Sequence, residues 1–310
     1  MGNLSKYQKL NNSFEQDELI FHVGSDAGFY SEFNNMVLAI AYCLKYRIKF
    51  LLYSEDANFG YKEGWTDFFL PFCDEVTSKF HRKHNLRYVD PFFLSRGFDR
   101  IKVLLYRLNH RHTYLTSDLF YRFRTVDFQR MFFSIPELGI DGNLRDISRY
   151  IIEMIYQFNE NTELEIKNLI KSIELPDKYI GLHIRGGDKF AEHELEACAT
   201  YITRAEQLSS LRDAYVLTDD YAVIQTLRKD YPYWHFYTLT DPSEKGYFHQ
   251  SFLKQTADDR RKKLIKLFAS MELLRSSELF VGTLSSNPGM FLGMCMDRVY
   301  GIDIDEWTVW

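Results

Sequence analysis

Arg185 follows a buried strand predicted over residues 179–184 and precedes two glycines, in the segment GLHIRGGDK (181–189). A guanidinium offers parallel N–H donors that match the oxygens of a diphosphate, and neighbouring glycines let a ligand approach the backbone closely. The pattern therefore predicts a phosphate contact at Arg185. The alternative, open from these residues alone, is that Arg185 only forms an ion pair with Asp188.

A second segment, VLTDDY (216–221), runs from a predicted strand into two carboxylates at the start of a helix. Asp219 and Asp220 suit the hydroxyls or ring nitrogens of a nucleotide. Asp220 is equally suited to act as a helix N-cap, with no ligand at all.

A third segment, LFVGTLSSNPG (279–289), places the hydroxyls of Thr283, Ser285 and Ser286 before a helix with Pro288 in its first turn. Backbone N–H groups at such a helix start attract anions, so the segment predicts an anion cradle. The competing interpretation is that one of Ser285, Ser286 and Asn287 is a plain N-cap.

The elements around these segments alternate regularly. Strands are predicted at 179–184, 214–217, 235–237, 279–281 and 299–302, with helices at about 196–211, 221–229, 261–276 and 288–294. Such alternation is typical of a parallel Rossmann-like sheet, which binds ligands at the carboxyl ends of its strands. The polar stretch 241–259 interrupts the pattern and is predicted to be a long loop near this edge.

The first half also begins as a βαβ unit. A strand over 19–23, a helix from about Ser31 and a strand over 48–53 indicate a second parallel sheet, whereas residues 60–141 give no clear order. Helices are predicted around 144–158 and 162–173, and Leu175-Pro176-Asp177 breaks the second. We therefore expect a domain boundary near residue 175.

Composition excludes several other classes. The net charge of −5 argues against a nucleic-acid surface, and 45% hydrophobic residues allow a sizeable core. The four cysteines are scattered, no signal-peptide core follows the N-terminus, and no apolar run is long enough to span a bilayer. A cytoplasmic protein is expected.

HIRGGDK, LTDD and FVGTLSSNPG, in this order, resemble the three motifs of the GDP-fucose fucosyltransferase superfamily. The α1,6-branch is the most similar, because of the Asp-Lys after the glycines and the hydroxyl pair in the third motif. The resemblance covers residues 178–300. It implies an α/β, GT-B-like fold of two Rossmann-type domains whose parallel sheets face a central cleft, with an acceptor-side domain at 1–174 and a nucleotide-sugar-binding domain at 175–310.

The resemblance also implies roles for individual residues. His183 would meet the guanine end of the donor, Arg185 the β-phosphate, and Asp219 or Asp220 the ribose or base. Ser285 and Ser286 would bind the diphosphate, Lys189 would reinforce Arg185, and Glu192 or Glu194 would be the base. The remaining expected donor contacts are Asp188, Tyr201, Glu272 and Thr283.

The chain departs from the family pattern in three places. Gly186 stands where the family has a second arginine, and Ser270 stands where an acid reads guanine, with Glu272 the nearest acid. The segment after Lys189 is about one residue shorter, so the base maps onto either Glu192 or Glu194. In the first half, the turn GFYSEFNN (28–35) lies where such enzymes keep a glycine-rich turn facing the cleft, but it matches no family motif.

The function expected is inverting transfer of fucose from GDP-fucose to a hydroxyl of a carbohydrate acceptor, in bacterial surface-polysaccharide synthesis. No metal cofactor is expected, because Arg185 and a helix N-terminus would replace the cation. One alternative is a metal-dependent transferase that uses Asp303-Ile304-Asp305. The other is a catalytically silent protein that binds a nucleotide sugar.

Overall fold

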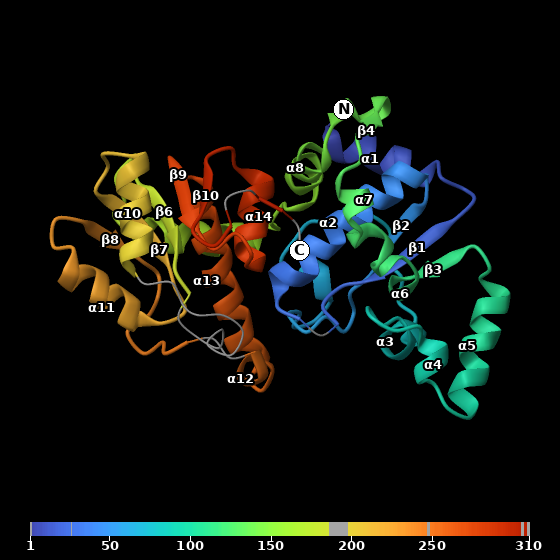
Figure 1. Cartoon of the computed structure of the whole chain (residues 1–310). Helices are drawn as coiled ribbons and strands as arrows, with labels where there is room; N and C mark the ends of the chain where they lie inside the picture. The colour runs from blue at the N-terminus through green and yellow to red at the C-terminus, as the bar shows by residue number, and fades with distance from the viewer. Residues whose placement is uncertain (1, 26, 186–197, 247–248, 305–306, 309–310) are drawn as a thin grey trace. The chain divides into compact units, whose positions relative to one another are not determined.

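The computed structural model describes residues 2–25, 27–185, 198–246, 249–304 and 307–308. The chain forms two compact units, Met1–Asn159 and Glu160–Trp310, which we call the N-terminal and C-terminal units. Each unit is built on a parallel sheet with helices beside it (Figure 1). Among the described residues, no helix has the length and apolar character needed to cross a membrane.

The sheet of the N-terminal unit has the strand order β2-β1-β3. Strands β1 (Glu18–His22), β2 (Lys49–Tyr53) and β3 (Thr113–Leu115) are all parallel. Helix α2 (Phe29–Tyr46) joins β1 to β2, so the predicted βαβ opening is confirmed. The strands are almost entirely buried, because both faces of a parallel sheet are covered.

Helix α2 is buried on nearly every side, and aromatic rings pack around its first turns. Phe29 stacks on Phe69 at 5.5 Å, and Trp65 stacks on Phe69 at 4.3 Å between ring centroids. Aromatic residues make up 16% of the chain. This cluster shows that part of them form the core of the N-terminal unit.

The region that gave no clear order from the sequence contains short elements. Between β2 and β3 lie η1 (Gly64–Asp67), α3 (Lys79–His84), α4 (Pro91–Leu94) and α5 (Phe98–Asn109). After β3 come α6 (Thr116–Phe120), η2 (Arg122–Arg124), α7 (Val126–Gln129), the antiparallel pair β4 (Phe133–Ile135) and β5 (Ile140–Gly142) with η3 (Pro136–Leu138) between them, and α8 (Leu144–Ile155). Helix α1 (Asn3–Asn12) precedes the sheet.

A buried ion pair holds the turn between β1 and α2. Glu32, which has no exposed side-chain surface, accepts hydrogen bonds from the N–H groups of Gly24 (3.2 Å) and Ala27 (3.0 Å). Its partner Arg87 lies 3.1 Å away with 2% of its side chain exposed, and its guanidinium packs on the ring of Tyr88. The carboxylate therefore fixes the turn and compensates a buried cation at once.

The C-terminal unit contains a five-stranded parallel sheet of order β10-β9-β6-β7-β8. Its strands are β6 (Ile180–His183), β7 (Asp213–Leu217), β8 (His235–Tyr237), β9 (Leu279–Gly282) and β10 (Val299–Gly301). Its helices are α9 (Glu160–Lys171), α10 (Cys198–Leu208), α11 (Tyr221–Asp230), α12 (His249–Leu253), α13 (Ala257–Arg275) and α14 (Asn287–Cys295). The alternation predicted from the sequence is confirmed.

The boundary between the units falls at 159/160, whereas the sequence placed it near residue 175. Helix α9 packs against α13, and Arg261 on α13 forms two hydrogen bonds (2.9 and 2.5 Å) with Glu165 on α9. The proline at 176 therefore lies beyond the end of a helix that belongs to the C-terminal unit. The stretch 241–259 also differs from a plain loop, because it contains α12 and the first turn of α13.

We predict that Glu32→Gln lowers the free energy of unfolding of the N-terminal unit by about 3–5 kcal/mol, because it removes the buried carboxylate that forms an ion pair with Arg87. The matched control is Glu137→Gln, which breaks the exposed pair with Arg47 at 3.6 Å and should cost below about 1 kcal/mol. Urea unfolding of both variants measures the difference. If both variants lost the same free energy of unfolding, the buried Glu32–Arg87 pair would contribute no more to stability than an exposed ion pair.

Candidate functional site at the carboxyl edge of the C-terminal sheet

The three polar segments meet at one edge of the C-terminal sheet. In the register of the parallel strands, His183 at the end of β6 is paired with Leu217 of β7 and with Gly282 of β9. The chain runs from β6 outward through β7 and β8, then returns to place β9 and β10 on the other side of β6. The strand order therefore reverses between β6 and β9, which is where such sheets bind ligands.

Arg185 lies just beyond β6 at this reversal. The Ile184 N–H donates to the Leu217 carbonyl at 3.0 Å, so β6 stays paired with β7 as far as the residue before Arg185. His183 is buried, with 5% of its surface exposed, and Arg185 is half-buried. Four further predicted site residues lie outside the described residues: Asp188, Lys189, Glu192 and Glu194.

The two carboxylates after β7 are in different situations. Asp220 caps α11, because its side chain accepts the Ala222 N–H at 2.9 Å. Asp219 is half-buried, and its carbonyl accepts the Gly246 N–H at 2.7 Å, which ties the stretch 241–246 to the end of β7. The capping interpretation thus holds for Asp220, and Asp219 is the better candidate for a ligand contact.

Ser286 and Ser285 also divide their roles. Ser286 is 1% exposed and is the N-cap of α14, accepting the Gly289 N–H at 3.1 Å and donating to the Thr283 carbonyl at 2.7 Å. A Cβ on Gly289 would lie 2.1 Å from the same carbonyl, so only glycine fits there. Ser285 is exposed beside this cap, where its hydroxyl can meet a ligand.

Asp303 shows that the turn after β9 binds an anionic group. Its carboxylate accepts the N–H of Leu284 at 2.8 Å and the N–H of Ser285 at 3.0 Å. These two donors face one anion in the way that a phosphate is held. The contacts account for Asp303 as a structural group. In the part of the chain that the structure describes, no group of three or more His, Cys, Asp or Glu side chains could hold a metal ion.

Three other residues were expected to contact the donor: Tyr201, Thr283 and Glu272. Each has a hydrogen-bond partner within the C-terminal unit. The ring of Tyr201 is buried, and its hydroxyl lies 3.1 Å from the Thr283 Oγ1, which braces the turn after β9. Ser270, which was not an expected donor contact, is 2% exposed and accepts a hydrogen bond from the Tyr215 hydroxyl at 2.8 Å. Glu272 is half-buried and accepts a hydrogen bond from Arg275 at 2.8 Å.

The N-terminal unit has its own reversal of strand order, which brings in a histidine that the sequence reasoning missed. His22 ends β1, its backbone N–H donates to the Thr116 hydroxyl at 2.8 Å, and its Nδ1 lies 2.8 Å from the Asn85 carbonyl. Its Nε2 lies 3.1 Å from the Asp56 Oδ1. The available signal was a polar residue, His22, directly after the apolar run Leu19–Phe21.

The surroundings of His22 favour charge on Asp56. Burial acts to raise the pKa of Asp56, but hydrogen bonds from His22 and Tyr53 outweigh it, so the pKa lies below its usual value. Burial, together with His22 and His110, lowers the pKa of His81 to about 4, so His81 is neutral near pH 7. The two ring nitrogens of His22 thus link a backbone carbonyl, that of Asn85, to the carboxylate of Asp56.

Comparison with solved structures identifies the fold. NodZ α-1,6-fucosyltransferase soaked with GDP-fucose has a TM-score of 0.56 and 14% identity, over 91% of this chain and 94% of that one. Fucosyltransferase NodZ from Bradyrhizobium has a TM-score of 0.56 and 13% identity, over 94% and 99%. A mutant of FUT1 from Arabidopsis thaliana in complex with GDP has a TM-score of 0.52 and 12% identity, over 96% and 74%.

No protein-family model matches the chain, and no curated protein matches it by sequence. At these identities the solved structures show the fold alone. The predicted fold class is confirmed: the chain has the α/β, GT-B-like fold of these fucosyltransferases.

We predict that Asp220→Ala lowers the free energy of unfolding of the C-terminal unit by about 1 kcal/mol, because α11 loses its cap, whereas Asp220→Asn keeps the cap and costs little. Thermal unfolding of both variants checks this. If Asp220→Asn were as destabilising as Asp220→Ala, the charge of Asp220 rather than its cap would matter.

Proposed function

We propose that this protein is an inverting glycosyltransferase that moves fucose from GDP-fucose to a hydroxyl of a carbohydrate acceptor. The observation that carries the proposal is the meeting of Arg185, Asp219 and the Ser285 turn at the edge where the strand order reverses. The fold supports it, because solved structures with this fold are fucosyltransferases, one soaked with GDP-fucose.

The C-terminal unit would hold the donor. The diphosphate would lie across the reversal between β6 and β9, within reach of Arg185 on one side and the Ser285 hydroxyl with the start of α14 on the other. His183 and Asp219, at the ends of β6 and β7, would contact the nucleoside. Tyr201, Thr283 and the Ser286 cap would keep the turn in shape. The N-terminal unit would supply contacts to the acceptor.

The reaction would be a direct displacement. The acceptor oxygen forms a bond to the anomeric carbon as the bond from that carbon to the diphosphate oxygen breaks, and the acceptor proton passes to a carboxylate, for which Glu192 or Glu194 is proposed. Negative charge grows on the leaving diphosphate. Preorganised donors at that position stabilise the transition state more than the ground state, and Arg185, with Lys189 as reinforcement, would supply them.

GDP should bind in the micromolar range and UDP at least tenfold more weakly, a difference of about 1.4 kcal/mol. The reason is that the groups at the ends of β6 and β7 would read the base, whereas the diphosphate contacts are common to both nucleotides. Calorimetric titration of the full chain measures both affinities. Equal or tighter binding of UDP would contradict a guanosine donor.

Arg185→Ala should lower kcat by roughly 10²–10³, with a smaller loss of GDP affinity, because the guanidinium contact strengthens as charge develops on the diphosphate. Arg185→Lys should recover little, since an ammonium cannot form the same pair of hydrogen bonds.

The matched control is Arg228→Ala, near the far end of α11, which should keep full activity. Melting temperature and turnover are measured on the same preparations. A folded and fully active Arg185→Ala protein would remove Arg185 from the mechanism. Slow hydrolysis of GDP-fucose by the unaltered protein separates a transferase from a silent nucleotide-sugar binder, which would show none.

A further inference from the structure

Helix α5 presents its apolar side chains to solvent. Phe98, Ile101, Leu104, Leu105 and Leu108 are between 45% and 71% exposed, and of the residues in α5 only Val103 is buried. Their spacing of three and four residues puts them on one face of the helix. Phe93 and Leu94 of the preceding α4 extend the apolar area, with 77% and 55% exposure. We call these seven residues the α4–α5 surface.

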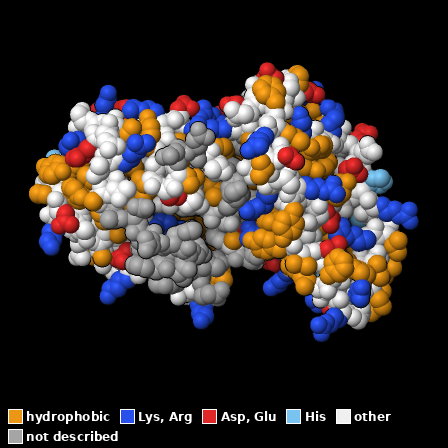
Figure 2. Space-filling model, in the orientation of Figure 1, with side chains coloured by type: hydrophobic (Ala, Val, Ile, Leu, Met, Phe, Trp, Pro, Cys, Tyr) orange, Lys and Arg blue, Asp and Glu red, His pale blue; other side chains and the backbone are white. Residues whose placement is uncertain are grey.

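This exposure needs a physical explanation. A helix of a globular protein normally turns its apolar stripe toward the core, and exposed apolar patches mark contact surfaces. The structure packs α5 through Val103 and leaves the apolar stripe exposed. Figure 2 shows hydrophobic and basic side chains intermingled at the lower right, where α4 and α5 lie in Figure 1.

The surface lies in the most basic part of the chain. Residues 79–112 hold nine Lys and Arg against two Asp, a charge of +7 in a chain whose net charge is −5. Arg96, Arg100, Lys102 and Arg111 are exposed around the apolar stripe. The asymmetry means that this segment attracts anionic surfaces although the whole protein is acidic.

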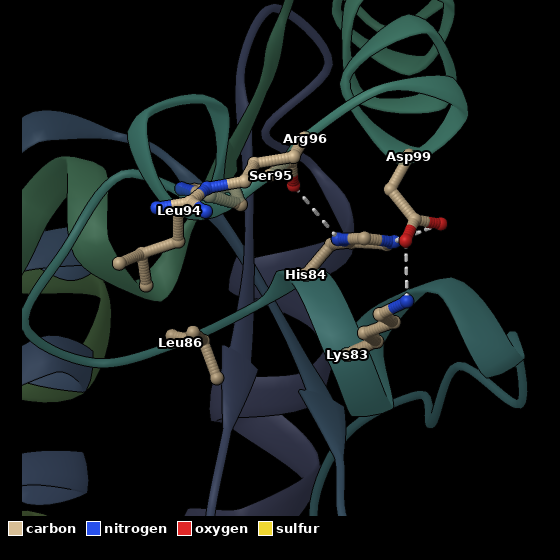
Figure 3. A pocket seen from close by; sticks show the side chains of 8 residues that line it. Lys83, His84, Leu86, Leu94, Ser95, Arg96 and Asp99 are labelled. Atoms are coloured by element: carbon tan, nitrogen blue, oxygen red, sulfur yellow. Dashed lines mark hydrogen bonds and ion pairs between the residues drawn. The ribbon is translucent and has the colours of Figure 1, made fainter.

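A pocket of about 330 Å³ opens beside the surface, lined by residues that include Lys83, Leu94, Arg96 and Asp99 (Figure 3). Lys83 is engaged by Asp99 at 2.5 Å, and His84 is buried between Ser95 and Asp99. Burial lowers the pKa of His84, so the ring adds no charge near pH 7. Arg96 is therefore the cation in the lining of this pocket that we expect to bind a small anionic group.

We propose that the α4–α5 surface docks onto an anionic lipid surface, with α5 lying in the plane of the interface. An amphipathic helix with aromatic and aliphatic residues on one side and Lys and Arg around them is the arrangement that binds such an interface. The apolar stripe would enter the boundary between headgroups and acyl chains. The basic rim would contact lipid phosphates, and the pocket at Arg96 has room for a headgroup.

Charge favours an anionic lipid surface over a second copy of the chain as the partner of the α4–α5 surface. A symmetric dimer through the α4–α5 surface would bring the exposed cations Arg96, Arg100, Lys102 and Arg111 of two copies together, which is unfavourable, whereas an anionic membrane complements them. The inference does not depend on the proposed transferase activity, because no residue of the C-terminal unit takes part in it.

Co-sedimentation of the full chain with vesicles tests the proposal. Vesicles of phosphatidylcholine with phosphatidylglycerol should bind the protein at low salt, and vesicles of phosphatidylcholine alone at least about tenfold more weakly. Raising the salt should weaken the first binding through screening. Equal binding to both vesicles, or no binding to either, would overturn the proposal, and this arm needs no variant.

Variants then locate the contact. Leu108→Glu should weaken vesicle binding at least about tenfold, because it removes apolar burial and adds a negative charge. Leu164→Glu on α9 is the matched control, since the two leucines are 57% and 59% exposed. Arg96→Glu should also weaken binding, and Lys171→Glu, likewise exposed on α9, should not.

Light scattering measures the oligomeric state, and so tests whether a second copy of the chain covers the α4–α5 surface. A dimer that Leu108→Glu converts to a monomer, without vesicle binding by the unaltered chain, would make a second copy the occupant and overturn the lipid proposal. Vesicle binding that survives both Leu108→Glu and Arg96→Glu would place the membrane contact elsewhere.

Discussion

The parallel pairing of β6 with both of its neighbours is the constraint on which the candidate site depends. Parallel strands end at one edge, and the register aligns His183 with Leu217 and Gly282. Residues about a hundred positions apart in the chain therefore follow neighbouring strands at the same edge: Arg185 follows β6 and Ser285 follows β9. The reversal of strand order between β6 and β9 leaves room at that edge, since the connections leave in opposite directions.

The turns at this edge are kept in shape by groups that use up their own hydrogen bonds. Asp220 and Ser286 cap helices, and Asp303 satisfies two backbone donors of the turn after β9. These three side chains already accept hydrogen bonds within the protein, and they fix the positions of neighbouring residues before a ligand binds. Catalysis gains from this preorganisation, because the donors need not rearrange as charge develops. In the proposed site, Arg185, Asp219 and Ser285 are the residues that contact the ligand.

The N-terminal unit contains a buried ion pair. Glu32 and Arg87 are removed from water together, and each also serves the backbone or a ring beside it. The basic segment 79–112 contains both Arg87 and the exposed α4–α5 surface. One stretch of chain thus braces the turn after β1 and carries the surface for which we propose a lipid partner.

The sequence by itself determined the alternation of strands and helices in the C-terminal unit, and with it the edge where Arg185 lies, because periodicity, glycines and caps are local signals. It also matched the fold that the solved structures show. Only the tertiary structure decided three other features. Helix α9 belongs to the C-terminal unit, Asp303 accepts two backbone hydrogen bonds of the turn after β9, and His22 lies within hydrogen-bond distance of Asp56. Each depends on packing or pairing between distant residues, whose energies no local pattern records.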